Sequence, residues 1–162
     1  MSALSIIKQF EGFSAKPYLC PANVWTIGYG YTLYKNGKLL KGAKNKSVAN
    51  SLYPNGISIV EASKLLEQDI ENTKTEILKL VKVSLTDNQL DALISFVYNV
   101  GISNFSNSTL LKELNKGNYN KVPNELKKWI NVTVNGVKKR QENIFFFLFT
   151  DRVLWYKENK QL

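Results

Sequence analysis

The sequence predicts an α+β fold with a small N-terminal lobe built on an antiparallel sheet, a long connecting helix and a larger helical C-terminal lobe. Residues 24–31 alternate bulky and small side chains with the period of a strand. Residues 59–81 carry apolar side chains at helical spacing, and the patterned segments that follow are helical too. We therefore expect one domain over residues 1–162, with its N-terminal lobe at about 12–57 and its helical lobe at about 82–162 plus the N-terminal helix.

The N-terminal lobe follows a short helix, predicted over residues 2–11 from its apolar spacing and ended by Gly12. Asn36-Gly37 between apolar pairs is a strong signal for a two-residue hairpin. The polar, turn-rich residues 41–56 predict a loop.

Capping signals set the helix starts in the second half. Ser58-x-x-Glu61 opens the long helix, and Thr86-x-x-Gln89 opens a helix that runs to Val100 and closes at Gly101. Three more helices are predicted, at residues 108–116, at 123–131 and from about Val137 into the aromatic run that includes residues 145–147.

Composition excludes several chemistries. Histidine is absent and Cys20 is the single cysteine, which rules out a Ser-His-Asp triad, a Cys-His dyad, a His-ligated metal and an internal disulfide. We therefore expect no cofactor and no metal. Proton chemistry is left to carboxylates, lysines, tyrosines or that thiol.

Charge points to an anionic partner, because 22 Lys and Arg residues against 13 Asp and Glu give a formal charge of +9. Only two of the cationic residues are arginine and no nucleic-acid motif is present, so we expect no nucleic-acid partner. No signal peptide is visible, and the longest apolar run has six residues, so stable membrane insertion is not expected.

Glu11 is the only carboxylate in the first sixty residues and ends a predicted helix, where the helix dipole favours its protonated form. It is either a solvated surface residue or a general acid, and a general acid there would need burial against apolar side chains. In the following strand, Thr26, Gly28 and Gly30 form a face of small residues that leaves room for a group to lie close to the backbone.

The order Glu11, eight residues, Cys20, five residues, Thr26 closely resembles the signature of the phage lysozymes of glycoside hydrolase family 24, in which the middle residue is Asp or, less often, Cys. The likeness continues in the family's order through three further blocks, at residues 85–101, at 108–117 and from Trp129 to Glu142. The resemblance implies the lysozyme-like fold. It also implies hydrolysis of the β-1,4 bond between N-acetylmuramic acid and N-acetylglucosamine in bacterial peptidoglycan.

By this resemblance, Glu11 is the acid that protonates the departing oxygen, and Thr26 holds a water or a sugar oxygen. Cys20 replaces the Asp that orients the attacking water in most relatives, and ordinary thiols are mostly protonated near neutral pH. Cys20 can attack the sugar as a thiolate, act as a base, place water as a thiol, or serve only as a small buried residue.

Substrate contacts are expected from Gly28, Gly30 and Asn99, although Asn99 equally suits a helix C-terminal cap. Tyr31 replaces the family's usual His, and we expect its hydroxyl to hydrogen-bond Asp69.

The resemblance implies an endolysin that causes host-cell lysis. It would wait as a monomer in the host cytoplasm and reach the cell wall when a holin releases it. Two alternatives stay open: a lytic transglycosylase that leaves 1,6-anhydro ends, and a catalytically impaired murein-binding protein.

Overall fold

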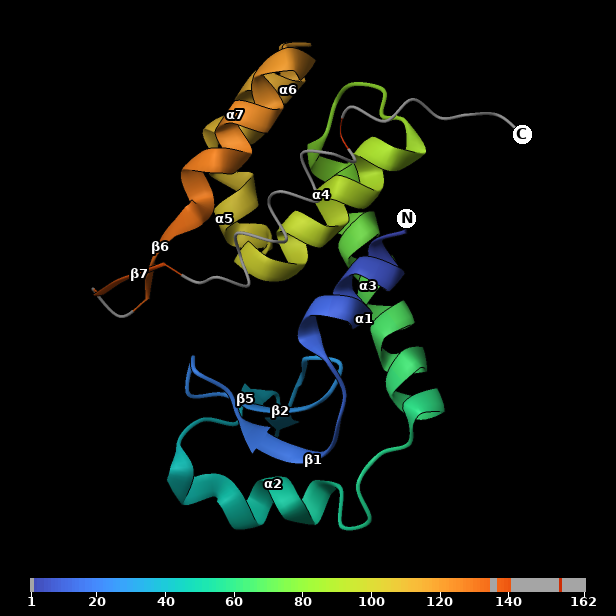
Figure 1. Ribbon diagram of the computed structural model, residues 1–162, viewed down its shortest axis with the longest axis vertical. Helices are drawn as coiled ribbons and strands as arrows, with labels where there is room; N and C mark the ends of the chain where they lie inside the picture. Colours follow the sequence, from blue (N-terminus) through green and yellow to red (C-terminus); the bar gives the residue numbers. More distant parts are fainter. Residues whose placement is uncertain (1, 135–136, 141–154, 156–162) are drawn as a thin grey trace. The chain divides into compact units, whose positions relative to one another are not determined.

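The computed structural model describes residues 2–134, 137–140 and 155, and the chain divides into two compact units (Figure 1). One unit is Ile7–Asp69, and the other joins Met1–Ile6 to Ile70–Leu162. The helices α1 (Ala3–Glu11) and α3 (Ile59–Leu80) contribute residues to both. The predicted α+β class is confirmed.

The smaller unit contains a three-stranded antiparallel sheet in the order β1-β2-β3. Its strands are β1 (Ser14–Leu19), β2 (Trp25–Gly28) and β3 (Tyr31–Thr32). Thr26 on the central strand is paired with Tyr18 on one side and Thr32 on the other. This register places the three side chains on one face of the sheet.

The predicted continuous strand over residues 24–31 is wrong at its end, because the chain reverses between β2 and β3 at Tyr29 and Gly30. Gly28 and Gly30 both have positive φ, at 65° and 78°, a conformation that favours glycine over every other residue. The glycines that resemble the small face of a strand therefore make a turn.

Three elements of the smaller unit were not predicted. Strand β1 carries Pro17, which masks its pattern; prolines are usually confined to strand edges or irregular pairing, and the β1–β2 register shifts between Ser14 and Tyr18. The predicted loop at 41–56 is wrong in part, because it contains the 3-10 helix η1 (Ala43–Asn45) and the helix α2 (Lys46–Leu52). Only Ala49 of α2 is buried, so the helix shows little apolar periodicity.

The hairpin prediction is confirmed by the strands β4 (Tyr34–Lys35) and β5 (Lys38–Leu39). Asn36 and Gly37 between them have φ of 51° and 73°, the two positive values of a type I′ turn. The core of the smaller unit joins buried residues from β2, the hairpin base, α2, the segment before α3, and α3 itself: Trp25, Ile27, Leu33, Leu40, Ala49, Ile57 and Ala62.

Both predicted capping boxes are confirmed. Glu61 N–H donates to Ser58 Oγ at 3.2 Å while Ser58 N–H donates to a Glu61 carboxylate oxygen at 2.9 Å, and α3 begins at the next residue after Ser58. Thr86 and Gln89 exchange the same pair of bonds at the start of α4 (Asp87–Val100). These bonds satisfy N-terminal amides that would otherwise have no partner.

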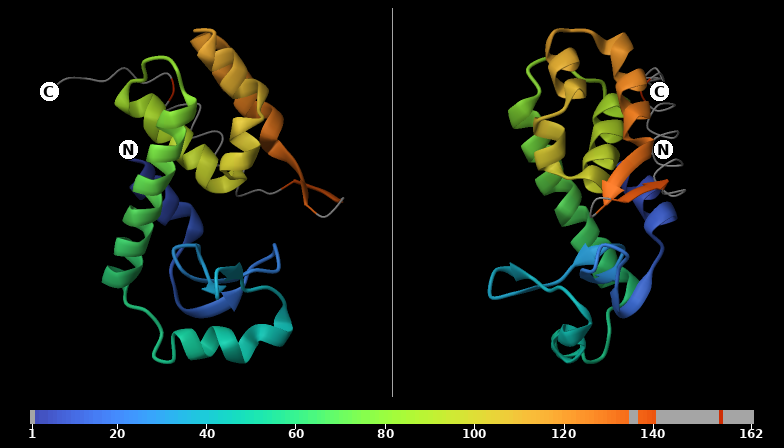
Figure 2. Two further views of the ribbon diagram at one scale, coloured as in Figure 1. Left: turned by 180° about the vertical axis from the view of Figure 1, so that it is seen from behind. Right: turned by 90° about the vertical axis from the view of Figure 1, so that its left-hand side faces the viewer.

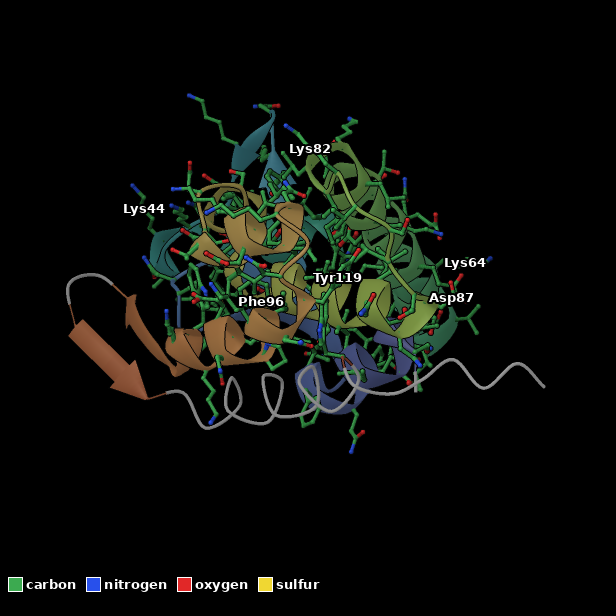
Figure 3. The ribbon with its side chains drawn as sticks, turned by 90° about the horizontal axis from the view of Figure 1, so that it is seen from above. Lys44, Lys64, Lys82, Asp87, Phe96 and Tyr119 are labelled. Carbon is green, nitrogen blue, oxygen red and sulfur yellow. The ribbon has the colours of Figure 1, made fainter. Side chains whose placement is uncertain are left out.

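The larger unit is helical through residue 130. After α4 come α5 (Ile102–Ser106), which was not predicted, α6 (Thr109–Asn115), the 3-10 helix η2 (Tyr119–Lys121), α7 (Val122–Lys127) and the 3-10 helix η3 (Lys128–Ile130). Phe96, labelled in Figure 3, is fully buried, and its ring meets those of Phe105 and Trp129 at steep angles. Such edge-on pairs add to the free energy gained by burial.

The predicted helix from Val137 is wrong at its start. The strands β6 (Asn131–Val134) and β7 (Val137–Arg140) pair as an antiparallel hairpin there. Residues 145–147 of the aromatic run lie outside the described residues.

Candidate active site

Glu11 is the last residue of α1, which ends there because Gly12 turns at φ 68° and its N–H bonds back to Lys8 O at 3.3 Å. The side chain is half-buried, and this burial raises the pKa of Glu11 above its ordinary value. A carboxyl group that keeps its proton more readily is what a general acid requires.

The carboxyl of Glu11 lies against the backbone of Gly30. A Cβ added to Gly30 would stand 3.0 Å from Glu11 Oε2 and 3.1 Å from its Cδ. The turn between β2 and β3 thus provides a side-chain-free surface on which the acid rests. The sequence predicted that a group would lie close to the backbone of the small residues Thr26, Gly28 and Gly30. At Gly30, that group is the carboxyl of Glu11.

Aromatic rings flank this turn. The rings of Phe13 and Tyr29 pack with centroids 5.5 Å apart, and Lys8 Nζ lies 5.5 Å from the Tyr29 ring centroid. Tyr29 directly precedes Gly30, so these contacts help to hold the turn that supports Glu11.

Cys20 directly follows β1 and starts the turn to β2. Asn23 N–H donates to Cys20 O at 2.8 Å, with Pro21 at the second position of the turn, which its fixed φ suits. Cys20 N–H in turn donates to Val24 O at 2.9 Å. The thiol-bearing residue is half-buried and held by main-chain bonds on both sides.

Thr26 is 3% exposed on the central strand, and its hydroxyl donates to the same Val24 O at 3.1 Å. One carbonyl therefore accepts from both Cys20 and Thr26, which ties together two of the residues predicted for catalysis. Because the Thr26 proton is committed to Val24, its oxygen lone pairs stay available to accept a hydrogen bond.

Tyr18 is a neighbour of the site that sequence reasoning missed. It is paired with Thr26 across β1 and β2, and burial together with the charges of Glu11 and Cys20 raises the pKa of Tyr18. The phenol is therefore within electrostatic reach of both candidate catalytic residues. In the sequence, Tyr18 lies two residues before Cys20, and residues at this spacing share a face of a strand. The spacing is informative only once β1 is known to be a strand.

The remaining predicted positions fall elsewhere. Gly28 is buried, and a Cβ there would stand 3.0 Å from Ala62 Cβ, so this glycine permits close packing of β2 on α3. Asn99 belongs to α4 in the other unit, where its Nδ2 donates to Ser95 O at 3.2 Å. Substrate contact by either residue stays a prediction.

The expected hydrogen bond between Tyr31 and Asp69 is absent from the described part of the chain. Tyr31 instead packs against the apolar core of the smaller unit, and burial raises the pKa of Asp69. Among the same residues, no cluster of three or more metal-ligating side chains occurs, and no helix is both long and apolar enough to cross a bilayer.

Residues 8–143 match the family model described as phage lysozyme. The chain is 36% identical over 146 residues to the endolysin of Acyrthosiphon pisum secondary endosymbiont phage 1, covering 85% of this chain and 89% of that protein. It is also 36% identical over 147 residues to the endolysin of Bacillus phage B103, covering 87% of this chain but only 50% of that longer protein. The solved muramidase domain of SpmX from Asticaccaulis excentricus superposes with a TM-score of 0.76 at 25% identity, covering 96% and 95% of the two chains.

The fold and these matches define a lysozyme-type glycoside hydrolase, a muramidase. The chain belongs to the phage lysozyme family and has the function of a phage endolysin.

Proposed function

We propose that Glu11 is the general acid of peptidoglycan hydrolysis and protonates the departing oxygen of the β-1,4 bond between N-acetylmuramic acid and N-acetylglucosamine. The single observation that carries this assignment is the half-buried carboxyl resting on Gly30, with its pKa raised by burial. When the proton leaves Glu11, the C–O bond breaks and positive charge develops at the sugar's anomeric carbon.

Thr26 and Cys20 would act on the water that completes the reaction. The free lone pairs of the Thr26 oxygen suit it to accept a hydrogen bond from that water, leaving the water's own oxygen free to attack. Cys20, held on the same Val24 carbonyl, stands where most relatives carry Asp. As a thiol it would place the water; as a thiolate it would accept the water's proton or attack the sugar directly.

Further substrate contacts are proposed for the backbone at Gly28 and Gly30 and for the amide of Asn99. The bond from Asn99 Nδ2 to Ser95 O leaves its Oδ1 available to a sugar N–H or hydroxyl.

We propose peptidoglycan as the partner of the protein, which would act as a monomer on the cell wall. It would be held in the host cytoplasm until a holin releases it, and it would use neither a cofactor nor a metal. The positive charge of +9 supports attraction to the anionic wall.

Mass spectrometry of muropeptides from digested cell walls tests the reaction. We expect reducing ends that have gained one water per cut, and Glu11→Gln should lower the rate by about a thousandfold or more because the amide has no proton to give. Anhydro ends would instead identify a lytic transglycosylase. If the folded parent cuts nothing, the protein is an impaired murein binder; if Glu11→Gln retains the parental rate, the acid assignment fails.

Replacement of Cys20 tests the second residue. Cys20→Asp should stay active because the carboxylate of the usual family residue is restored. Cys20→Ser should be strongly impaired if the sulfur reacts or accepts a proton, since a serine hydroxyl does neither readily at neutral pH. Equal rates for Cys20→Ser and the parent would eliminate a chemical role for sulfur.

A further inference from the structure

The β4–β5 hairpin carries an exposed apolar pair on one face. Tyr34 and Leu39 are directly opposite across the two strands, and their residues are 52% and 41% exposed. A cross-strand pair shares one face of a hairpin, so the two side chains form a continuous apolar surface. Within the described residues, no hydrogen bond or ring contact covers the Tyr34 side chain.

The other face of the hairpin tip is cationic. Lys35 and Lys38 form the neighbouring cross-strand pair, and like charges opposite one another destabilise a hairpin. No acidic residue occurs between Glu11 and Glu61 to offset them, whereas that segment holds six lysines: Lys16, Lys35, Lys38, Lys41, Lys44 and Lys46. An arrangement that weakens the hairpin, yet concentrates positive charge, suits an anionic partner.

The base of the hairpin is anchored by buried side chains and main-chain hydrogen bonds. Leu33 and Leu40 at its base are 2% and 6% exposed, and Leu40 N–H donates to Leu33 O at 2.9 Å. Trp25 bonds to both, through its O to Leu33 N–H at 2.8 Å and through its N–H to Leu40 O at 2.9 Å. The right-hand view of Figure 2 shows the tip extending away from the other strands of its unit. The apolar and cationic side chains are thus presented on a rigid support.

We propose that the β4–β5 hairpin docks peripherally on the surface of an anionic lipid bilayer. Tyr34 and Leu39 enter the boundary between headgroups and acyl chains, and Lys35 and Lys38 extend to lipid phosphates. The apolar face decides between a bilayer and an anionic wall polymer, because a soluble polymer offers charge but no apolar phase to receive Tyr34 and Leu39. Lys44, which projects outward in Figure 3, is an exposed lysine of the same lysine-rich segment.

Co-sedimentation with vesicles tests this docking. The full chain is mixed with vesicles of phosphatidylcholine alone and of phosphatidylcholine with phosphatidylglycerol, and only the second are expected to bind it. Lys35→Gln/Lys38→Gln should weaken binding about tenfold or more, since each lysine near a charged bilayer contributes about 1 kcal/mol. Tyr34→Ser/Leu39→Ser should weaken it by about tenfold through loss of apolar burial.

The matched control is Lys112→Gln/Lys127→Gln, which removes the same charge from exposed positions in the larger unit and should bind as the parent does. Thermal unfolding verifies that each variant is folded, and Leu39→Ser alone replaces the apolar double variant if that one unfolds. Equal losses from both lysine pairs, or parental binding by the hairpin variants, would overturn the proposal. It would also be overturned if the parent ignores vesicles and the hairpin variants lose binding to isolated anionic wall polymer instead.

Discussion

Gly28 and Gly30 are two residues apart in sequence, both have positive φ, and yet they serve different regions of the smaller unit. The space beside Gly28 is filled by the methyl group of Ala62 on α3, whereas the space beside Gly30 is filled by the carboxyl of Glu11. One glycine therefore permits helix–strand packing and the other positions an acid. The difference teaches that a run of small residues acquires its meaning from what the fold places against it.

Among the changes that test this difference between the two glycines, Gly30→Ala should have the largest effect, because Gly30 is the glycine that positions Glu11. The new methyl would lie 3.0 Å from Glu11 Oε2, and the flexible carboxyl would move away from it. A displacement of about 1 Å in a catalytic group costs about a hundredfold in rate. Cell-wall turbidity assays should show this loss in protein that remains folded. A rate within threefold of the parent would mean that the resting place of Glu11 on Gly30 is irrelevant to catalysis.

Gly28→Ala should instead act on stability. The added methyl meets Ala62 Cβ at 3.0 Å, which cannot swing aside, and the positive φ is unfavourable for alanine. Overpacking and backbone strain together should lower the free energy of unfolding by about 2–4 kcal/mol. Denaturant unfolding measures this loss of stability. A double-mutant cycle with Ala62→Gly should show favourable coupling, and additive effects would contradict the contact.

A smaller effect is expected on stability, because burial disfavours the charged form of Glu11. Because its pKa is raised in the folded state, the carboxyl favours folding below the unfolded-state pKa of about 4.3, and this contribution is lost as pH rises through the folded-state pKa. Glu11→Gln, which cannot ionise, should therefore be more stable than the parent at neutral pH, with the gap closing in acid. Unfolding curves across pH measure it, and a gap that widens in acid would reverse the sign.

The smallest effect is expected on the pKa of Tyr18, which lies within electrostatic reach of both Glu11 and Cys20. Since the charge of Glu11 helps to raise the pKa of Tyr18, Glu11→Gln should lower that pKa. NMR titration of labelled tyrosine rings measures the change. Tyr53 is the internal control, because its raised pKa has other causes, namely burial, Tyr31 and Glu61. A fall at Tyr53 of the same size would show a general rather than a local change.

Local signals in the sequence predicted much of the fold. The Asn36-Gly37 turn and the boxes opened by Ser58 and Thr86 depend on bonds between near neighbours, so their residues alone were sufficient. Strand β1 was missed because Pro17 interrupts its pattern, and α2 because it buries a single alanine.

For the site, the sequence identified Glu11, Cys20 and Thr26 through spacing and resemblance. It could not reveal that Tyr18 is paired with Thr26, because this depends on the pairing of β1 with β2. Nor could it reveal that Gly28 lies against Ala62 while Gly30 lies against Glu11, because this depends on where α3 and α1 meet the turn. Long-range contacts of this kind leave no trace in neighbouring residues.

The shared acceptor at Val24 has a consequence for how this family can vary. Cys20 is anchored through its main-chain amide, a donor that every residue except proline supplies, so the scaffold does not depend on which side chain occupies that position. The Thr26 hydroxyl donates to the same oxygen, and this bond does not involve the side chain at position 20. A carboxylate can therefore replace the thiol at position 20 without loss of the main-chain bonds that form the turn.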